Sequence, residues 1–268
     1  MSGFLYKHVL LVGATSGIGS GMADRLVEAG IKVTAVGRRK ERLDEFVQKH
    51  TQKMTQGLVF DVGDIGKAPQ FAADVMKQYP DIDCVFLNAG TQRFYDLTNP
   101  KDFDVKSFQH EINVNFMSNV ALTQAFLPFM MPKNSSFIFT TSLLSITPLS
   151  SIPAYSASKA ALNSFILCLR EQLKRSTVKV IEVSPPLVQS ELPYSSLMRH
   201  TLLTIYLLAA ELNGPVGMPL KQYVEETWKG LESGSDQVVG GTLGNPKLFM
   251  SIVHNRRKIF EEYSNSWN

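Results

Sequence analysis

Short runs of apolar, mostly β-branched residues alternate along this chain with segments whose apolar residues recur at the helical period. The runs are apolar throughout, without polar residues at every second position, which is typical of strands covered on both faces. Strands and helices in alternation predict a doubly wound α/β fold, a parallel sheet with helices on both faces. The expected strands are 8–14, 32–37, 57–62, 83–90, 136–142, 178–185 and 237–241, and the expected helices are 17–29, 39–49, 67–79, 105–131, 154–175 and 219–232.

The composition agrees with one folded unit over residues 1–268. The chain is 44% hydrophobic, enough for a sizeable core, and its net charge of +3 comes without blocks of like charge, which disfavours nucleic-acid binding. No apolar run reaches the roughly 18 to 20 residues of a membrane-spanning helix, and the N-terminus lacks a signal-peptide layout. Cys84 and Cys168 lie in apolar surroundings, so both are expected to be buried in a reducing, cytoplasmic setting.

A glycine-rich turn follows the first expected strand and opens the first expected helix. In "GATSGIG", Gly13, Gly17 and Gly19 let the backbone turn tightly and approach a pyrophosphate closely, with Ser16 and Ile18 between them. The helix N-terminus then offers free N–H groups and the positive end of its dipole. The turn therefore predicts a Rossmann-type dinucleotide site, with a plain tight turn as the alternative.

The end of the second expected strand bears on the choice of dinucleotide. Folds that take NAD usually place an acid about 20 residues after the glycines to hold the ribose 2′-hydroxyl, but position 37 is glycine. Arg38 and Arg39 follow at a helix start, where cations are unfavourable unless an anion lies between them. The pair favours NADP(H), whose 2′-phosphate is such an anion; a solvent-facing basic pair is the alternative.

Polar or turn-forming residues follow four of the other expected strands. In an open α/β sheet ligands bind outside the carboxyl ends of the strands, so these residues are expected to meet at one edge. Each also has an ordinary explanation as a turn or capping residue. The residues at these strand ends are, in chain order, Asp61 with Val62, Asn88 to Gly90, Ser142 and Pro185.

The stretch "AYSASKAAL" places Tyr155 and Lys159 four residues apart, on one face of a helix. The ordinary tyrosine pKa, near ~10, is too high for ready proton exchange at neutral pH, and a neighbouring ammonium is expected to lower it. The small residues around the pair leave room for a cofactor. The pair is therefore interpreted as a proton donor with its tuning cation; a solvated helix face is the alternative.

"GATSGIG", "LNAG", Ser142 and "YSASK" together resemble the motif set of the short-chain dehydrogenase/reductase family, from residue 8 to about 190. The resemblance implies NADP(H)-dependent carbonyl reduction or alcohol oxidation. It implies that Ser142 polarises the substrate oxygen, Tyr155 protonates it, Lys159 binds the nicotinamide ribose, and Asn115, better placed than Asn113, holds a water. The residues expected at the cofactor are Gly13, Ser16, Gly17, Ile18, Gly19, Arg38, Arg39, Asp61, Val62, Asn88, Ala89, Gly90, Tyr155, Lys159, Pro185, Val188 and Ser190, and no metal ion is expected.

The segment 186–218 is too irregular and long for an ordinary connection, and it is rich in apolar residues. We interpret it as a lid over a bulky hydrophobic carbonyl substrate, with Phe94, Leu144, Leu192 and Tyr194 as expected substrate contacts. A subunit interface or a peripheral membrane contact explains the apolar content equally well. The resemblance further implies a homodimer or homotetramer built through the helices at 105–131 and 154–175. A non-catalytic NADP(H)-binding protein and a reductase of imines or enones remain alternatives.

Overall fold

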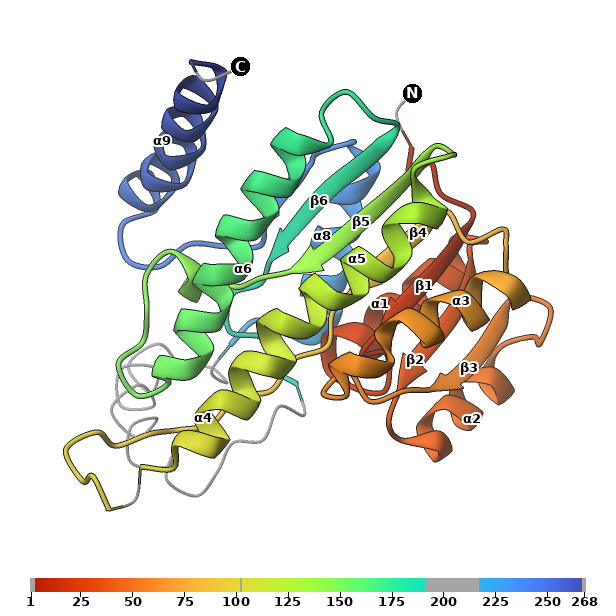
Figure 1. Cartoon of the computed structure of the whole chain (residues 1–268), viewed down its shortest axis with the longest axis horizontal. Coiled ribbons are helices and arrows are strands. Elements are labelled where there is room, and N and C mark those ends of the chain that lie inside the picture. The colour runs from red at the N-terminus through yellow and green to blue at the C-terminus, as the bar shows by residue number, and fades with distance from the viewer. Residues whose placement is uncertain (1–2, 102, 191–216, 267–268) are drawn as a thin grey trace.

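A computed structural model of the chain describes residues 3–101, 103–190 and 217–266. Its parallel strands form one sheet in the order β3-β2-β1-β4-β5-β6-β7 (Figure 1). The order reverses between β1 and β4, and at that point a crevice opens beyond the carboxyl ends of the strands. The strands are β1 His8–Val12, β2 Lys32–Gly37, β3 Thr55–Val59, β4 Cys84–Leu87, β5 Ser135–Thr140, β6 Val178–Ser184 and β7 Gln237–Val239.

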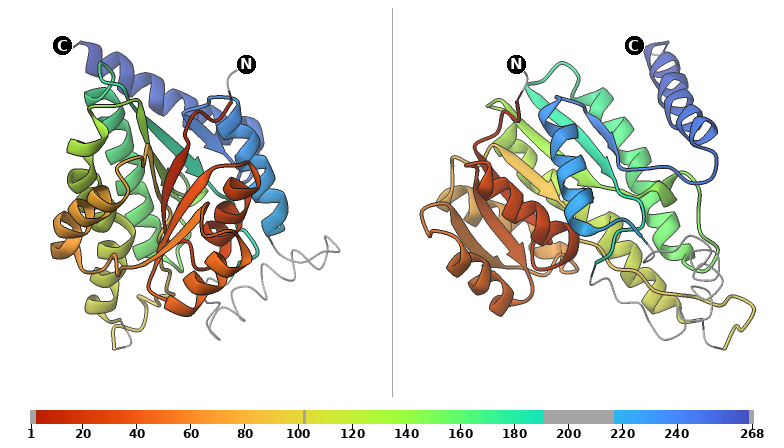
Figure 2. Two further views of the ribbon diagram at one scale, coloured as in Figure 1. Left: turned by 90° about the vertical axis from the view of Figure 1, so that its right-hand side faces the viewer. Right: turned by 180° about the vertical axis from the view of Figure 1, so that it is seen from behind.

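Helices cover both faces of this sheet, as the two further views in Figure 2 show. One face packs against α1 Gly17–Glu28, α2 Lys40–Lys49 and α8 Leu220–Glu232. The other packs against α3 Ala68–Gln78, α5 Ser118–Met130 and α6 Pro153–Gln172. Because both faces are covered, β1, β4 and β5 are buried at every residue, which explains why apolar residues follow one another without alternation in their central positions. The predicted doubly wound fold is confirmed.

The helix expected at 105–131 is divided into three parts. It runs as α4 Val105–Ile112, a π-helical turn η2 Asn113–Met117, and α5. A π-turn inserts an extra residue into the helix and is frequent at functional sites. Two short 3-10 turns, η1 Ile65–Lys67 and η3 Leu143–Ser145, complete the connections between strands and helices.

A helix that sequence reasoning did not identify follows β7. This helix, α9 Pro246–Asn265, lies beside α6 at the side of the molecule (Figure 1). Its start carries recognisable signals, since the Asn245 side chain accepts from the Leu248 N–H and Pro246 occupies the first turn. Phe249 and Val253 are buried with Leu143 in a small apolar cluster.

The expectation that both cysteines are buried is wrong for one of them. Cys84 is fully buried in β4, but Cys168 is exposed on α6. Cys168 lies among apolar residues in the sequence, yet its neighbours Leu167 and Leu169 point to the core and leave it on the solvent side of the helix.

Candidate active site

The glycine-rich turn between β1 and α1 is held close to two other strands. Gly13 and Gly17 have positive φ angles of 87° and 53°, which favour glycine. The N–H groups of Gly13 and Ala14 both donate to the Val36 carbonyl of β2, at 2.8 and 3.0 Å. A Cβ atom on Gly13 would come within 2.6 Å of the Ala89 backbone, so only glycine fits against the turn that follows β4.

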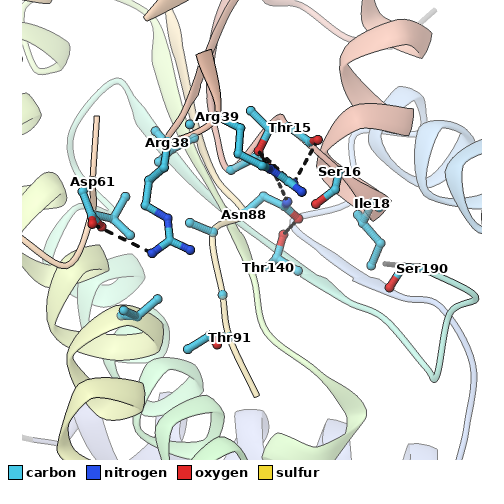
Figure 3. A pocket seen from close by; sticks show the side chains of 18 of the residues that line it. Thr15, Ser16, Ile18, Arg38, Arg39, Asp61, Asn88, Thr91, Thr140 and Ser190 are labelled. Atoms are coloured by element: carbon cyan, nitrogen blue, oxygen red, sulfur yellow. Dashed lines mark hydrogen bonds and ion pairs between the residues drawn. The ribbon is translucent and has the colours of Figure 1, made fainter. Parts of the chain in front are cut away.

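A cavity of about 360 Å³ opens beside this turn at the carboxyl ends of the strands (Figure 3). Most residues expected at the cofactor line it: Gly13, Ser16, Gly17, Ile18, Arg38, Arg39, Asp61, Val62, Asn88, Ala89, Gly90, Tyr155, Lys159, Pro185 and Ser190. Gly19 and Val188 are not among its lining residues. Gly19 instead lies under the turn, where a Cβ atom would come within 1.9 Å of the Gly13 carbonyl oxygen.

A series of hydrogen bonds, which we name the Asn88 bridge, joins the glycine turn to the lysine of α6. The Asn88 amide donates to the Gly13 carbonyl at 3.1 Å, and its oxygen accepts from the Thr140 hydroxyl at 2.9 Å. Lys159 Nζ then donates to the Thr140 carbonyl at 2.7 Å. The bridge links β1, β4, β5 and α6 across the floor of the cavity.

Burial shifts the pKa values of Tyr155 and Lys159 in opposite directions. Lys159 is 3% exposed, and its burial lowers its pKa to about 8. Burial raises the pKa of Tyr155 to about 12, a hydrogen bond with Ser142 opposes that rise, and the charge of Glu111 adds to it. Lys159 Nζ lies 5.6 Å from the centre of the Tyr155 ring. The expectation that the ammonium lowers the pKa of Tyr155 is therefore wrong for the protein alone, because burial has the larger effect.

Ser142 and Asn115 lie next to this pair without lining the cavity. Ser142 is buried at the start of η3, where its hydroxyl accepts from the Leu144 N–H at 3.1 Å. Asn115 is fully buried in η2 and exchanges two hydrogen bonds of 2.8 Å with the Thr91 backbone. A Cβ atom on Gly90 would lie 3.3 Å from Asn115 Oδ1 and 3.7 Å from Lys159 Nζ, so Asn115 and Lys159 flank the same turn.

The two arginines after β2 adopt different arrangements (Figure 3). Arg38 is 66% exposed, and its Nη1 lies 3.9 Å from an Asp61 oxygen across the cavity mouth. Arg39 reaches back to the glycine turn, where Nη2 donates to the Thr15 carbonyl at 3.0 Å and to its hydroxyl at 3.1 Å. Together they place two guanidinium groups at the β2 end of the cavity.

The expected substrate contacts are only partly described. Phe94 and Leu144 are half-buried on the segments after β4 and β5, outside the cavity lining. Leu192 and Tyr194 lie outside the described residues, as does 191–216 of the expected lid. The two ends of that segment are joined, since the Gln189 N–H donates to the Met218 carbonyl at 3.0 Å and the Met218 N–H to the Leu187 carbonyl at 2.8 Å.

Several lining residues were missed by the sequence reasoning. Thr15 stands within the glycine motif, while Thr91 and Thr140 lie next to recognised strand ends, so their positions were available from the same signals. His110 lies mid-helix, and nothing in the sequence marks it. Glu111 beside it was also missed, because its burial depends on the packing of α4 against α6.

The described part of the chain holds neither a cluster of metal-binding side chains nor a membrane-spanning helix. Among residues 3–101, 103–190 and 217–266, no three His, Cys, Asp or Glu side chains are grouped so that they could hold a metal ion. No helix within those residues is both long and apolar enough to cross a membrane.

The chain has clear relatives among known proteins. The sequence profile of a family described as short chain dehydrogenase matches residues 7–197. The chain is 32% identical over 235 residues to DltE, an uncharacterized oxidoreductase of Bacillus subtilis (strain 168), and the match covers 86% of each protein. It is 33% identical over 196 residues to dehydrogenase/reductase SDR family member 7B of Rattus norvegicus, covering 69% of this chain and 58% of the rat protein.

Solved structures share the fold at lower identity. A short chain dehydrogenase/reductase from Burkholderia phymatum in complex with NAD superposes with a TM-score of 0.77 at 18% identity, covering 98% of this chain and 97% of that one. A short chain dehydrogenase from Burkholderia cenocepacia J2315 in complex with NADP gives a TM-score of 0.72 at 23% identity, covering 94% of this chain and 93% of that one. Both nicotinamide dinucleotides thus occur on this fold.

Proposed function

Because this chain belongs to the short-chain dehydrogenase family, we propose that it is an NADP(H)-dependent oxidoreductase that reduces a carbonyl compound or oxidises the corresponding alcohol. The observation that carries the proposal is the meeting of Ser142, Tyr155 and Lys159 beside the cavity that the glycine turn lines. A protein that only bound the dinucleotide would have no need of a phenol, a hydroxyl and an ammonium at that place.

The glycine turn fits a dinucleotide. The close approach of Gly13 to Ala89 leaves backbone rather than side chains at the cavity wall, which suits a pyrophosphate lying against the start of α1. When bound, NADP(H) supplies or accepts the hydride. Asn88 to Gly90 would lie along its ribose, and Asp61 would accept from the adenine amino group.

Tyr155 is the proposed proton donor to the substrate oxygen. The phenol is protonated at neutral pH, as carbonyl reduction requires, although its raised pKa makes it a weaker acid than an ordinary tyrosine. The Ser142 hydroxyl, which hydrogen-bonds to the phenol, would hold the same oxygen and fix its position. Lys159 would donate to the nicotinamide ribose and, when charged, stabilise the phenolate left after proton transfer.

A preference for NADP(H) over NAD(H) rests on the residues at the end of β2. Gly37 leaves no acid for a ribose 2′-hydroxyl, and its Cβ position is filled by Thr15, 2.4 Å away. Arg38 and Arg39 both line the cavity, and their guanidinium groups are suited to a 2′-phosphate.

The substrate is proposed to be bulky and hydrophobic. The support is the apolar sequence of 186–218 together with Phe94 and Leu144, which follow β4 and β5 near the catalytic residues. Reduction of an imine or an enone would use the same residues, Asn115, Ser142, Tyr155 and Lys159, so the experiment below includes both.

A screen of NADPH oxidation across aldehydes, ketones, enones and imines tests the proposal. We expect the largest kcat/KM with large aromatic or alicyclic ketones. Tyr155→Phe keeps the ring and removes the proton donor, so turnover should fall by about two orders of magnitude or more while NADPH binding persists. Near-normal turnover of Tyr155→Phe would remove the residue from the mechanism, and NADPH binding without any turnover would favour a binding protein.

A further inference from the structure

A carboxylate that the mechanism above does not use is buried in the sheet close to Ser142. Glu182 lies in β6 between Ile181 and Val183, and its exposure is 0%. Burial of an ionised carboxyl group is unfavourable unless hydrogen bonds replace the water that it loses. A side chain like those of its two neighbours would avoid this cost, so the carboxylate points to a role beyond packing.

Four side chains, each from a different part of the fold, form hydrogen bonds with this carboxylate. Its Oε1 accepts from the Thr141 hydroxyl at 2.6 Å, from the Asn163 amide at 2.8 Å and from the Ser184 hydroxyl at 3.1 Å. Its Oε2 accepts from the Gln237 amide at 3.3 Å. The Thr141 and Ser184 hydroxyls are also only 2.8 Å apart, so the five residues form one network, which we name the Glu182 cluster.

The cluster reaches Ser142 through Thr141, the residue before it. The backbone N–H of Thr141 donates to the Val183 carbonyl at 2.9 Å, and that of Leu143 donates to the Pro185 carbonyl at 3.1 Å. Ser142 lies between these two bonds, so the position of its hydroxyl depends on how the three residues are held against the end of β6. The hydrogen bond from the Thr141 side chain to the carboxylate adds a third attachment at the same place.

Two other members of the cluster stand beside residues of the candidate site. Asn163 lies one helical turn after Lys159 on α6, and Ser184 directly precedes Pro185, which lines the cavity. Gln237 differs from them, because neither of its neighbours in the chain lines the cavity. The carboxylate therefore joins the ends of β5 and β6 to the helix that carries Tyr155, and β7 is attached on the side away from the site.

We propose that Glu182 is a positioning residue of the active site, which through Thr141 holds the Ser142 hydroxyl in place to bind the substrate oxygen beside Tyr155. The inference rests on the proposed roles of Ser142 and Tyr155. An acceptor on β6 fixes the hydroxyl before the substrate arrives, so less reorganisation is needed as the transition state forms. If the cluster served stability alone, the loss of any of its hydrogen bonds would lower the Tm without a selective effect on turnover.

Two substitutions break the connection from opposite sides. Glu182→Met keeps the length of the side chain and removes both acceptor oxygens, while Thr141→Val keeps the shape and removes the hydroxyl. In each variant kcat for carbonyl reduction should fall about tenfold, and the Kd for NADPH should stay within about twofold of the wild type. Gln237→Leu is the matched control, because it removes a hydrogen bond to the same carboxylate on the side away from Ser142. Its Tm should also fall, but its kcat should not.

A double-mutant cycle with Ser142→Ala shows whether the effect passes through the serine. Without that hydroxyl Glu182 has nothing to position, so adding Glu182→Met or Thr141→Val to Ser142→Ala should cause no further loss of kcat. Unchanged kcat in both single variants, or an equal fold loss with and without the hydroxyl, overturns the inference. A loss in Gln237→Leu as large as that in Glu182→Met does the same. Should Glu182→Met fail to fold, Thr141→Val completes the cycle alone.

Amide hydrogen exchange separates this inference from the proposed function. In the full chain without cofactor, the Leu143 amide should exchange at least about tenfold faster in Glu182→Met and Thr141→Val than in the wild type, relative to the amides of β1. In Gln237→Leu it should exchange at the wild-type rate. If the wild type turns over no carbonyl, imine or enone, the proposed function fails, while exchange at Leu143 still decides whether Glu182 holds this stretch. Unchanged exchange in both variants would show that it does not.

Discussion

Several residues of the candidate site lie in surroundings that are unfavourable for their chemical groups and that folding alone would not select. The Lys159 ammonium is buried and donates to the Thr140 carbonyl, and the charge of Glu111 helps to raise the pKa of the Tyr155 phenol. The sequence motif located Tyr155, Lys159 and Ser142, but not the direction of the tyrosine pKa shift, because desolvation depends on the surrounding packing. Glu111 could not be found from the sequence for the same reason.

Arg38 should discriminate between the two dinucleotides. Arg38→Ala removes a charge-assisted contact to the 2′-phosphate, so NADPH binding should weaken by about 1.5 to 3 kcal/mol while NADH binding is nearly unchanged. Arg42→Ala, an exposed arginine of α2 outside the cavity lining, is the control and should leave both affinities intact. Fluorescence titration with each cofactor measures the difference, and equal losses for both would assign Arg38 a structural role.

The buried lysine makes stability depend on pH. Burial lowers the pKa of Lys159 to about 8 in the folded state, below its ordinary value of 10.5. Between these values the unfolded chain binds a proton that the folded chain does not, so the free energy of unfolding rises with pH. The full gain is about 3 kcal/mol at most.

Urea unfolding of the wild type and Lys159→Met at pH 7 and pH 10 measures this gain. The free energy of unfolding of the wild type should rise relative to that of Lys159→Met across the interval. Parallel pH dependence of the two proteins would show that Lys159 keeps an ordinary pKa in the fold.

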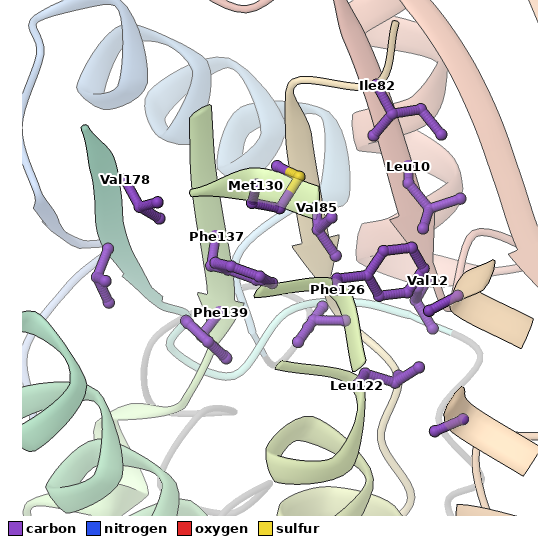
Figure 4. Packing of buried hydrophobic residues seen from close by; sticks show 14 of the residues in the cluster. Leu10, Val12, Ile82, Val85, Leu122, Phe126, Met130, Phe137, Phe139 and Val178 are labelled. Carbon is purple, nitrogen blue, oxygen red and sulfur yellow. The ribbon is translucent and has the colours of Figure 1, made fainter. Parts of the chain in front are cut away.

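At the scale of elements, the sequence predicted the sheet and most of its helices because burial on both faces leaves a uniform apolar pattern. Figure 4 shows Phe126 of α5 near Val85 and Phe137 of the central strands. Prediction was poorer at the edge of the sheet. The expected strand 57–62 is β3 Thr55–Val59, in which only Thr55 is buried, and its polar first residues gave no apolar signal.

The junction of β1 and α1 should not tolerate a side chain at Gly19. The Cβ atom of Gly19→Ala would overlap the Gly13 carbonyl oxygen, a backbone atom that moves only with the whole turn. We expect cofactor affinity to fall at least about tenfold and the Tm to drop. In the control Gly21→Ala, the new Cβ would come within 2.8 Å of a side-chain methyl of Val224, away from the cavity, so stability should fall with cofactor affinity retained. Equal cofactor affinity in the two variants would contradict this account of the turn.

The whole molecule is expected to assemble as a homodimer or homotetramer through the outer faces of α5 and α6. Met117, Phe129 and Met131 are exposed apolar side chains along that side. Light scattering at micromolar concentration should show at least a dimer. The exposed thiol of Cys168 on α6 should react more slowly with a thiol reagent as protein concentration rises. The buried thiol of Cys84 should not react at any concentration. A monomer with a uniformly reactive Cys168 would exclude this mode of assembly.

The Asn88 bridge has a thermodynamic consequence. The turn that would receive the pyrophosphate and the lysine that would receive the ribose are already joined through Asn88 and Thr140. Ligand association then requires little ordering of that wall, so its calorimetric signature should lack the large negative heat-capacity change of coupled folding. Asn88→Ala would leave the Gly13 carbonyl and the Thr140 hydroxyl without these partners, and the same titration should then show a more unfavourable entropy of binding.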